Sequence, residues 1–85
     1  MSSPEERLAE LGLSIPEMVR PMAAYVPTVR SGSIVYTAGQ LPMVNGQLPR
    51  TGKVGAEVPT EVARQLAAQC ALNALAAIKA EVGEL

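Results

Sequence analysis

One long helical segment near the C-terminal end sets the main constraint on how this 85-residue chain can fold. The segment begins near Pro59 or Thr60, where Thr60 is a candidate cap and Glu61 suits the positive end of the helix dipole. It runs to about Val82, and Gly83 is expected to end it. One polar stripe repeats every four residues and is expected to be the solvated face of the helix: Glu61, Gln65, Gln69 and Asn73.

Nearly every other position of this segment is Ala, Leu, Ile, Val or Cys, so the sequence predicts a helix that is buried on most sides. The rest of the chain offers only short strands, which cannot cover a helix of this length. A helix that follows strands normally returns to the sheet through another strand, and none follows Val82. We therefore expect that partner chains complete the core or that the chain is a fragment of a longer domain, and core size favours the fragment.

Two turn signals upstream of the helix predict short antiparallel hairpins. Ser31-Gly32 precedes residues 33–40, whose β-branched and aromatic side chains make this run the strongest predicted strand. Asn45-Gly46 is the preferred pair for a type I′ turn, and the nearby prolines keep its arms short. Residues 50–58 contain two glycines and are expected to form a loop.

A short helix is predicted at the N-terminus, over about residues 4–11. Ser3 is a candidate cap, Glu6 completes a capping box, and Gly12 is a natural stop. Residues 13–27 are expected to be an extended connector, because three prolines interrupt them: Pro16, Pro21 and Pro27.

Composition excludes several kinds of site. The chain has one Cys and no His, so we expect no disulfide, no metal site and no cofactor. Cys70 is expected to be a small buried hydrophobe, because no His is present to activate it as a nucleophile. Seven basic and eight acidic residues form no basic cluster, and the only aromatic residues are two Tyr, which argues against a nucleic-acid partner. Neither a signal peptide nor a membrane-spanning run is evident, so a cytoplasmic protein without membrane contact is expected.

Several motifs, in order along the chain, resemble the RidA/YjgF family. They are AYVPTVRSGSIVYTAGQLP from residue 24, TGKVGAE from residue 51, and CALNAL from residue 70, while ERLAELG from residue 6 is similar to an extra segment of one subgroup. We accordingly divide the chain into an N-terminal helix with its proline-rich connector, residues 1–23, and the N-terminal half of a RidA-like domain, residues 24–85. The resemblance implies an α+β, chorismate-mutase-like fold and a homotrimer with ligand sites between subunits.

The resemblance also implies an activity, the hydrolysis of reactive enamines or imines to keto acids and ammonia, by a deaminase that acts on small carboxylate-bearing substrates. In that chemistry water adds to the C=N carbon, and an arginine holds the substrate carboxylate. The family's arginine and glutamate lie in the half that this sequence does not match. Catalytic residues therefore stay unknown, enzyme activity stays open, and the chain alone is expected to be inactive or incomplete. The alternative is a non-catalytic small-molecule-binding or scaffold member of the same fold.

Four positions carry over to the family's substrate pocket. Tyr25 matches the pocket tyrosine, and Gly39 matches the glycine whose backbone lines the pocket. Ala38 stands where active deaminases usually have Ser, so a hydroxyl for substrate or water is missing, and Gln40 is a possible polar lining. The alternatives are that Tyr25 is an amphipathic residue at a sheet edge, that Gly39 forms a β-bulge, and that Gln40 is only a strand end.

Overall fold

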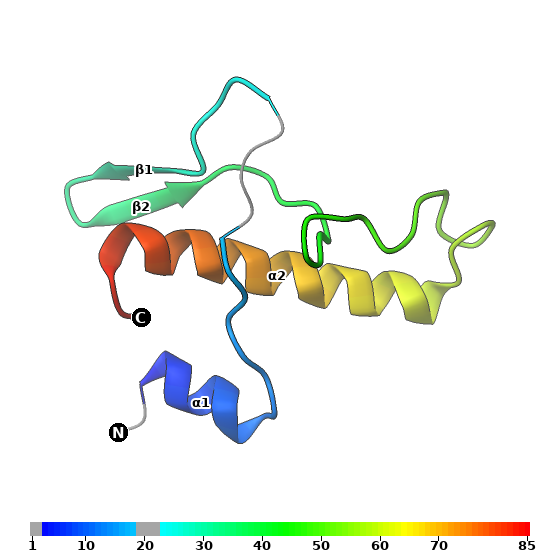
Figure 1. The fold of residues 1–85 in the computed structure, drawn as a ribbon, viewed down its shortest axis with the longest axis horizontal. Coiled ribbons are helices and arrows are strands. Elements are labelled where there is room, and N and C mark those ends of the chain that lie inside the picture. Colours follow the sequence, from blue (N-terminus) through cyan, green and yellow to red (C-terminus); the bar gives the residue numbers. More distant parts are fainter. Residues whose placement is uncertain (1–2, 19–22) are drawn as a thin grey trace.

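The computed structural model describes residues 3–18 and 23–85, and its helices and strands form an α+β arrangement (Figure 1). The elements in order are α1 (Pro4–Glu10), β1 (Thr28–Ser31), β2 (Ile34–Thr37) and α2 (Thr60–Val82). The two strands pair antiparallel into one sheet, which lies against the C-terminal part of α2. In this view α1 lies on the opposite side of α2 from the sheet. The expected hairpin and long helix are therefore confirmed.

The turn between β1 and β2 differs from the prediction by one residue. Gly32 has a φ of 60° and takes the first position of a two-residue turn, with Ser33 in the second. A glycine with positive φ at the first position is typical of a type II′ turn, which matches the twist of the paired strands. The predicted turn at Ser31-Gly32 is therefore one residue too early, since Ser31 still pairs with Ile34. The predicted strand over residues 33–40 is also too long, because β2 spans only Ile34–Thr37.

The second turn is confirmed at Asn45-Gly46. Both residues have positive φ, 51° and 79°, as a type I′ turn requires. Val44 and Gln47 exchange two backbone hydrogen bonds across it, of 2.9 and 3.1 Å, and form an isolated bridge. The arms extend no further, as the flanking prolines predicted.

α1 has the predicted caps at both ends. The Ser3 hydroxyl accepts a hydrogen bond from the Glu6 N–H at 3.2 Å. At the other end Gly12 has a φ of 75°, and the Leu13 N–H donates to the Leu8 carbonyl at 2.9 Å, which is the bonding of a Schellman motif. Of the expected extended connector, residues 13–18 and 23–27 contain no helix or strand, and Pro21 lies outside the described residues.

α2 begins one residue away from the predicted cap. Pro59 takes the N-cap position with extended backbone and no side-chain hydrogen bond, so the expected capping role of Thr60 is wrong. Thr60 is the first helical residue and follows the N-cap, so its side chain does not occupy the capping position. Gly83, with a φ of 93°, ends the helix as predicted, and its N–H donates to the Lys79 carbonyl at 2.7 Å.

The core is small, and the described chain covers α2 only in part, as its short strands predict; burial of α2 on most sides, which needs a partner chain or the rest of a longer domain, stays a prediction. Only three residues of α2 are buried: Asn73, Ala76 and Ala77. The two alanines join Met43 and Val58 in the hydrophobic core. The physical reason is that a sheet of two four-residue strands covers only part of a 23-residue helix.

The sheet exposes one apolar face. The register pairs Val29 with Tyr36 and Ser31 with Ile34. Since side chains alternate along a strand, Val29, Ile34 and Tyr36 share one face, which we call the outer sheet face, and Val35 lies on the other. Val35 is half-buried, whereas the three side chains of the outer sheet face are 55%, 55% and 59% exposed, respectively.

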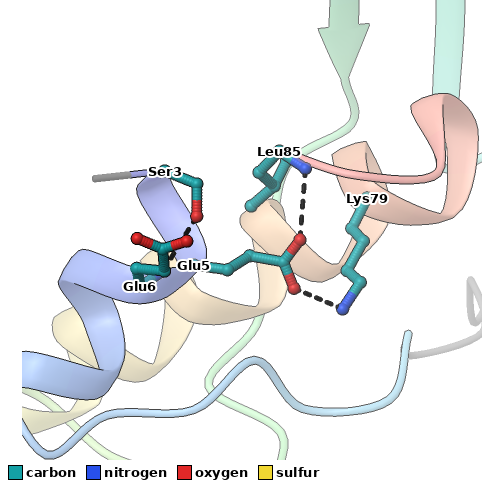
Figure 2. Close-up of polar contacts among 5 residues, drawn as sticks. All are labelled: Ser3, Glu5, Glu6, Lys79 and Leu85. Atoms are coloured by element: carbon teal, nitrogen blue, oxygen red, sulfur yellow. Dashed lines mark hydrogen bonds and ion pairs between the residues drawn. The ribbon is translucent and has the colours of Figure 1, made fainter. Parts of the chain in front are cut away.

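Glu5 links α1 to Lys79 near the C-terminal end of α2 and to Leu85 beyond it (Figure 2). The two carboxylate oxygens of Glu5 accept hydrogen bonds from Lys79 Nζ at 2.5 Å and from the Leu85 N–H at 3.3 Å. The hydrogen bond from Lys79, followed by that from Leu85, holds the pKa of Glu5 below its ordinary value. Glu5 therefore favours attachment of α1 while it is ionised.

We expect this attachment to be lost in acid. A carboxyl with a lowered folded-state pKa stabilises the fold above its unfolded pKa, about 4.3, and this stability disappears as the pH falls through the folded pKa. The amide signals of α1 and Leu85 should therefore shift together in an NMR titration, with a midpoint below about pH 4.3. Glu5→Gln should abolish this transition and Glu6→Gln should retain it. A midpoint at or above the ordinary glutamate pKa would contradict the assignment.

Candidate functional site

The four predicted pocket residues gather at one end of the hairpin. Because β1 and β2 are antiparallel, the chain before Thr28 and the chain after Thr37 meet at the same end of the sheet. The Ala38 N–H donates to the Pro27 carbonyl at 2.9 Å, so the pairing continues one residue beyond the strands. We call residues 25–27 and 38–40 the hairpin base. The structure thus brings the segment of Tyr25 beside that of Ala38, Gly39 and Gln40.

Tyr25 and Gly39 are both open to solvent. Tyr25 is 49% exposed, and its hydroxyl has no hydrogen-bond partner among the described residues. Gly39 lies beyond the end of β2, so the alternative of a β-bulge within the strand is wrong. A Cβ built on Gly39 would meet no atom within 4 Å, so the described chain does not itself require glycine here. The role of these residues in a pocket stays a prediction.

Ala38 and Gln40 are half-buried and contact each other. The Gln40 side-chain amide donates to the Ala38 carbonyl at 3.4 Å, so its polar end braces the local backbone. With its N–H bonded to Pro27, Ala38 has both backbone groups engaged and carries only a methyl group. The Tyr25 hydroxyl is therefore the most available side-chain polar group at the hairpin base.

The segment after the hairpin base is anchored by Asn73, which is only 1% exposed. The Asn73 Nδ2 donates to the carbonyls of Leu41 at 2.9 Å and Met43 at 3.1 Å. The Asn73 Oδ1 accepts a hydrogen bond from the Gln69 side-chain amide at 3.0 Å. The buried Asn73 amide therefore links α2 to Leu41 and Met43, which lie 32 and 30 residues earlier in the sequence.

The predicted solvated stripe is therefore wrong at its C-terminal end. Glu61 and Gln65 are exposed as expected, but Gln69 is half-buried and Asn73 is buried. The cause is the crossing segment at residues 41–43, which covers Asn73 and whose carbonyls at Leu41 and Met43 accept its two N–H bonds. One signal in the sequence could have indicated this, because asparagine is a poor helix former and here interrupts the most apolar stretch of α2.

The loop of residues 50–58 is organised around Glu57. The Glu57 carboxylate accepts the Lys53 N–H at 3.0 Å, and the Arg50 guanidinium donates to the Glu57 carbonyl at 3.1 Å. Hydrogen bonds from its own N–H and then from that of Lys53 hold the pKa of Glu57 below its ordinary value. This carboxylate is thus engaged in holding the loop together.

Within residues 3–18 and 23–85, no group of three or more His, Cys, Asp or Glu side chains is placed to hold a metal ion. No helix in the same part of the chain has the length and apolar character needed to cross a membrane. Cys70 is a half-buried free thiol.

Comparisons with known proteins agree with one another. A family model described as "YjgF/chorismate_mutase-like, putative endoribonuclease" matches residues 5–85. The chain is 32% identical to "Protein TCP17" of Trypanosoma cruzi over 78 residues. This matched region covers 92% of this chain and 49% of that protein.

Two solved structures share the fold. The protein Atu1372 from Agrobacterium tumefaciens, described as having unknown function, is 42% identical with a TM-score of 0.78, over 94% of this chain and 48% of that one. A protein from Shewanella oneidensis MR-1, described as "a putative endoribonuclease", is 34% identical with a TM-score of 0.91, over 99% of this chain and 56% of that one. The chain therefore spans about half the length of these relatives.

Proposed function

Because the chain belongs to the YjgF/chorismate mutase-like family, we propose that its hairpin base forms one wall of a small-ligand site in a domain that hydrolyses reactive enamines or imines. Membership confirms the RidA/YjgF resemblance and the α+β fold, of which this chain forms a part. The observation that carries the proposal is that Tyr25 and Gly39 lie at the same end of the hairpin, both exposed and with open space at Gly39. A ligand can therefore approach both residues.

In the proposed reaction, water adds to the electrophilic carbon of a C=N bond. The carbon–nitrogen bond then breaks, and the products are a keto acid and ammonia. The share of this chain is binding, because the Tyr25 hydroxyl can form a hydrogen bond with the ligand and Gly39 lets the backbone approach it closely. We assign no acid, base or arginine partner for a carboxylate to residues of this sequence.

The second candidate is a non-catalytic binding protein, and Ala38 favours it. A serine hydroxyl at this position could hold a water molecule or the ligand, whereas the methyl group of Ala38 cannot. The two candidates are separated by generating a short 2-imino acid from its amino acid with an amino-acid oxidase and measuring keto-acid formation. Acceleration above the spontaneous rate supports the deaminase. Calorimetric binding of 2-oxobutyrate without acceleration supports the binding protein. If the protein shows neither acceleration nor binding, both candidates are excluded.

The description of the matched family also names an endoribonuclease, but the net charge of this chain does not favour RNA binding. Seven basic residues are outnumbered by eight acidic ones, so no net positive charge attracts a phosphate backbone. RNA binding that weakens steeply with added salt would be needed to revive this role.

We further propose that the site lies between subunits of a homo-oligomer, which the family resemblance indicates is a trimer. The exposed outer sheet face supports this, because three large apolar side chains remain open to solvent on one two-stranded sheet: Val29, Ile34 and Tyr36. A contiguous apolar surface of this kind is typical of protein interfaces.

Gly39→Ala is expected to preserve the fold and to impair ligand binding. Gly39 does not have a positive φ, and its new Cβ would meet no atom of the chain, so stability should change by less than about 0.5 kcal/mol. A ligand held against the Gly39 backbone would meet the added methyl group, and binding of 2-oxobutyrate should weaken about 10-fold, or about 1.4 kcal/mol. Calorimetry on the full-length protein measures this change, with Ser33→Ala in the exposed turn as the control. Unchanged affinity would place the ligand elsewhere.

A further inference from the structure

The chain makes a tight turn directly after the hairpin base. The Met43 N–H donates to the Leu41 carbonyl at 2.8 Å, which closes a three-residue turn centred on Pro42. Proline suits this position because its ring fixes φ near the value that such a turn requires. The carbonyls on both sides of Pro42, those of Leu41 and Met43, accept hydrogen bonds from the same Asn73 amide.

Asn73 provides the side-chain hydrogen bonds that join α2 to this turn in the described part of the chain. Packing holds the two ends of the turn unequally, because Met43 is 6% exposed whereas Leu41 is 49% exposed. The end nearer the hairpin base therefore depends on its carbonyl for attachment to α2. Leu41 directly follows Gln40, so its position sets where the chain leaves the hairpin base.

The orientation of the Asn73 amide is itself fixed. The Gln69 amide donates to the Asn73 Oδ1, so the Nδ2 of Asn73 points at the two carbonyls. Gln69 lies one helical turn earlier on the same face of α2. An aspartate at position 73 would have the same shape but would place an oxygen against two carbonyl oxygens, and a leucine would remove every polar contact.

We propose that Asn73 is a positioning residue for the ligand site. By holding the turn at Pro42 on α2, it fixes the place of Gly39 and Gln40 at the hairpin base. This inference rests on the proposed function of the hairpin base as a ligand site. It assigns to Asn73 an effect on ligand affinity that goes beyond its contribution to stability.

The test compares Asn73→Asp and Asn73→Leu with the wild type in the full-length protein. Gln65→Leu, at an exposed position on the same helix, is the matched control. Hydrogen exchange at Ala38 and Met43, whose N–H groups are hydrogen-bonded, should accelerate at least about 10-fold in both variants, while exchange in β1 and β2 changes less than about 2-fold. The KM for the imine, or the Kd for 2-oxobutyrate, should rise at least about 10-fold, with kcat within about 3-fold of the wild type. The control should resemble the wild type in both measurements.

Two results would overturn the inference. One is exchange that accelerates equally along the whole chain, which means that Asn73 acts only on global stability. The other is local acceleration at residues 38–43 with unchanged KM and Kd, which means that Asn73 has no effect on ligand affinity.

If the wild type neither hydrolyses the imine nor binds 2-oxobutyrate, the proposed function fails, and the inference that depends on it falls as well. The hydrogen-exchange result then still decides separately whether Asn73 holds the segment locally. If both Asn73 variants fail to fold, Gln69→Leu replaces them, because it removes only the donor to Oδ1. It should give smaller changes in the same direction, and no local change would count against the inference.

Discussion

Gly52→Ala is expected to destabilise the protein by about 3 kcal/mol or more. Gly52 has a φ of 130°, a conformation that residues with a Cβ rarely adopt. A Cβ at this position would lie 2.6 Å from the Glu57 Cβ, well inside contact distance. The Glu57 Cβ cannot rotate away, since it is attached directly to the backbone of a loop that Glu57 itself holds together through Lys53 and Arg50. Urea denaturation of the full-length protein measures the loss.

Gly55→Ala is the matched control in the same loop. Gly55 also has a positive φ, 89°, but a Cβ there would meet no atom within 4 Å. Gly55→Ala should therefore lower the free energy of unfolding only by the backbone strain, about 1 kcal/mol. Equal losses for the two variants would show that the close approach of Gly52 to Glu57 contributes nothing.

Val29→Asp is expected to dissociate the proposed oligomer. Val29 pairs with Tyr36 on the outer sheet face, which is exposed in the single chain and is proposed to be covered in the assembly. Placing a carboxylate in a covered apolar surface costs several kcal/mol unless a partner is present. The dissociation constant should rise at least about 100-fold, or about 2.7 kcal/mol, as measured by sedimentation or native mass spectrometry.

Ser33→Asp supplies the control for the added charge, because Ser33 lies in the exposed turn of the same hairpin. It should leave the assembly intact. A wild-type protein that is monomeric and melts at the same temperature at every concentration would refute the oligomer itself, since the stability of an oligomer depends on protein concentration.

The elements that the sequence predicted well depend on local interactions. The Ser3 cap, the Asn45-Gly46 turn and the stop at Gly83 each act over a few residues, and all three are confirmed. The turn at Gly32 was misplaced by one residue because Ser31-Gly32 and Gly32-Ser33 are both acceptable turn pairs, and only strand pairing decides between them.

The predicted solvated stripe failed because its burial depends on a contact between segments distant in the sequence. The spacing of polar residues places Asn73 in a solvated stripe, but in the structure residues 41–43 cross α2 and cover it. For the candidate site, the family motifs selected Tyr25 and Gly39, but only the antiparallel register places them at the same end of the hairpin.

The two-stranded sheet also has a consequence for synthesis of the chain. Within the described residues, β1 and β2 each have a neighbour on one side only, so each leaves an edge of N–H and C=O groups to which another strand can add. The hairpin is complete at Thr37, whereas α2, the element that covers its inner face, ends at Val82. At a synthesis rate of about 5–20 residues per second, the interval between completion of the hairpin and completion of α2 is about 2–10 s, and the inner face of the hairpin is uncovered during that time. Slower translation of this stretch should therefore raise the fraction of protein that aggregates during expression.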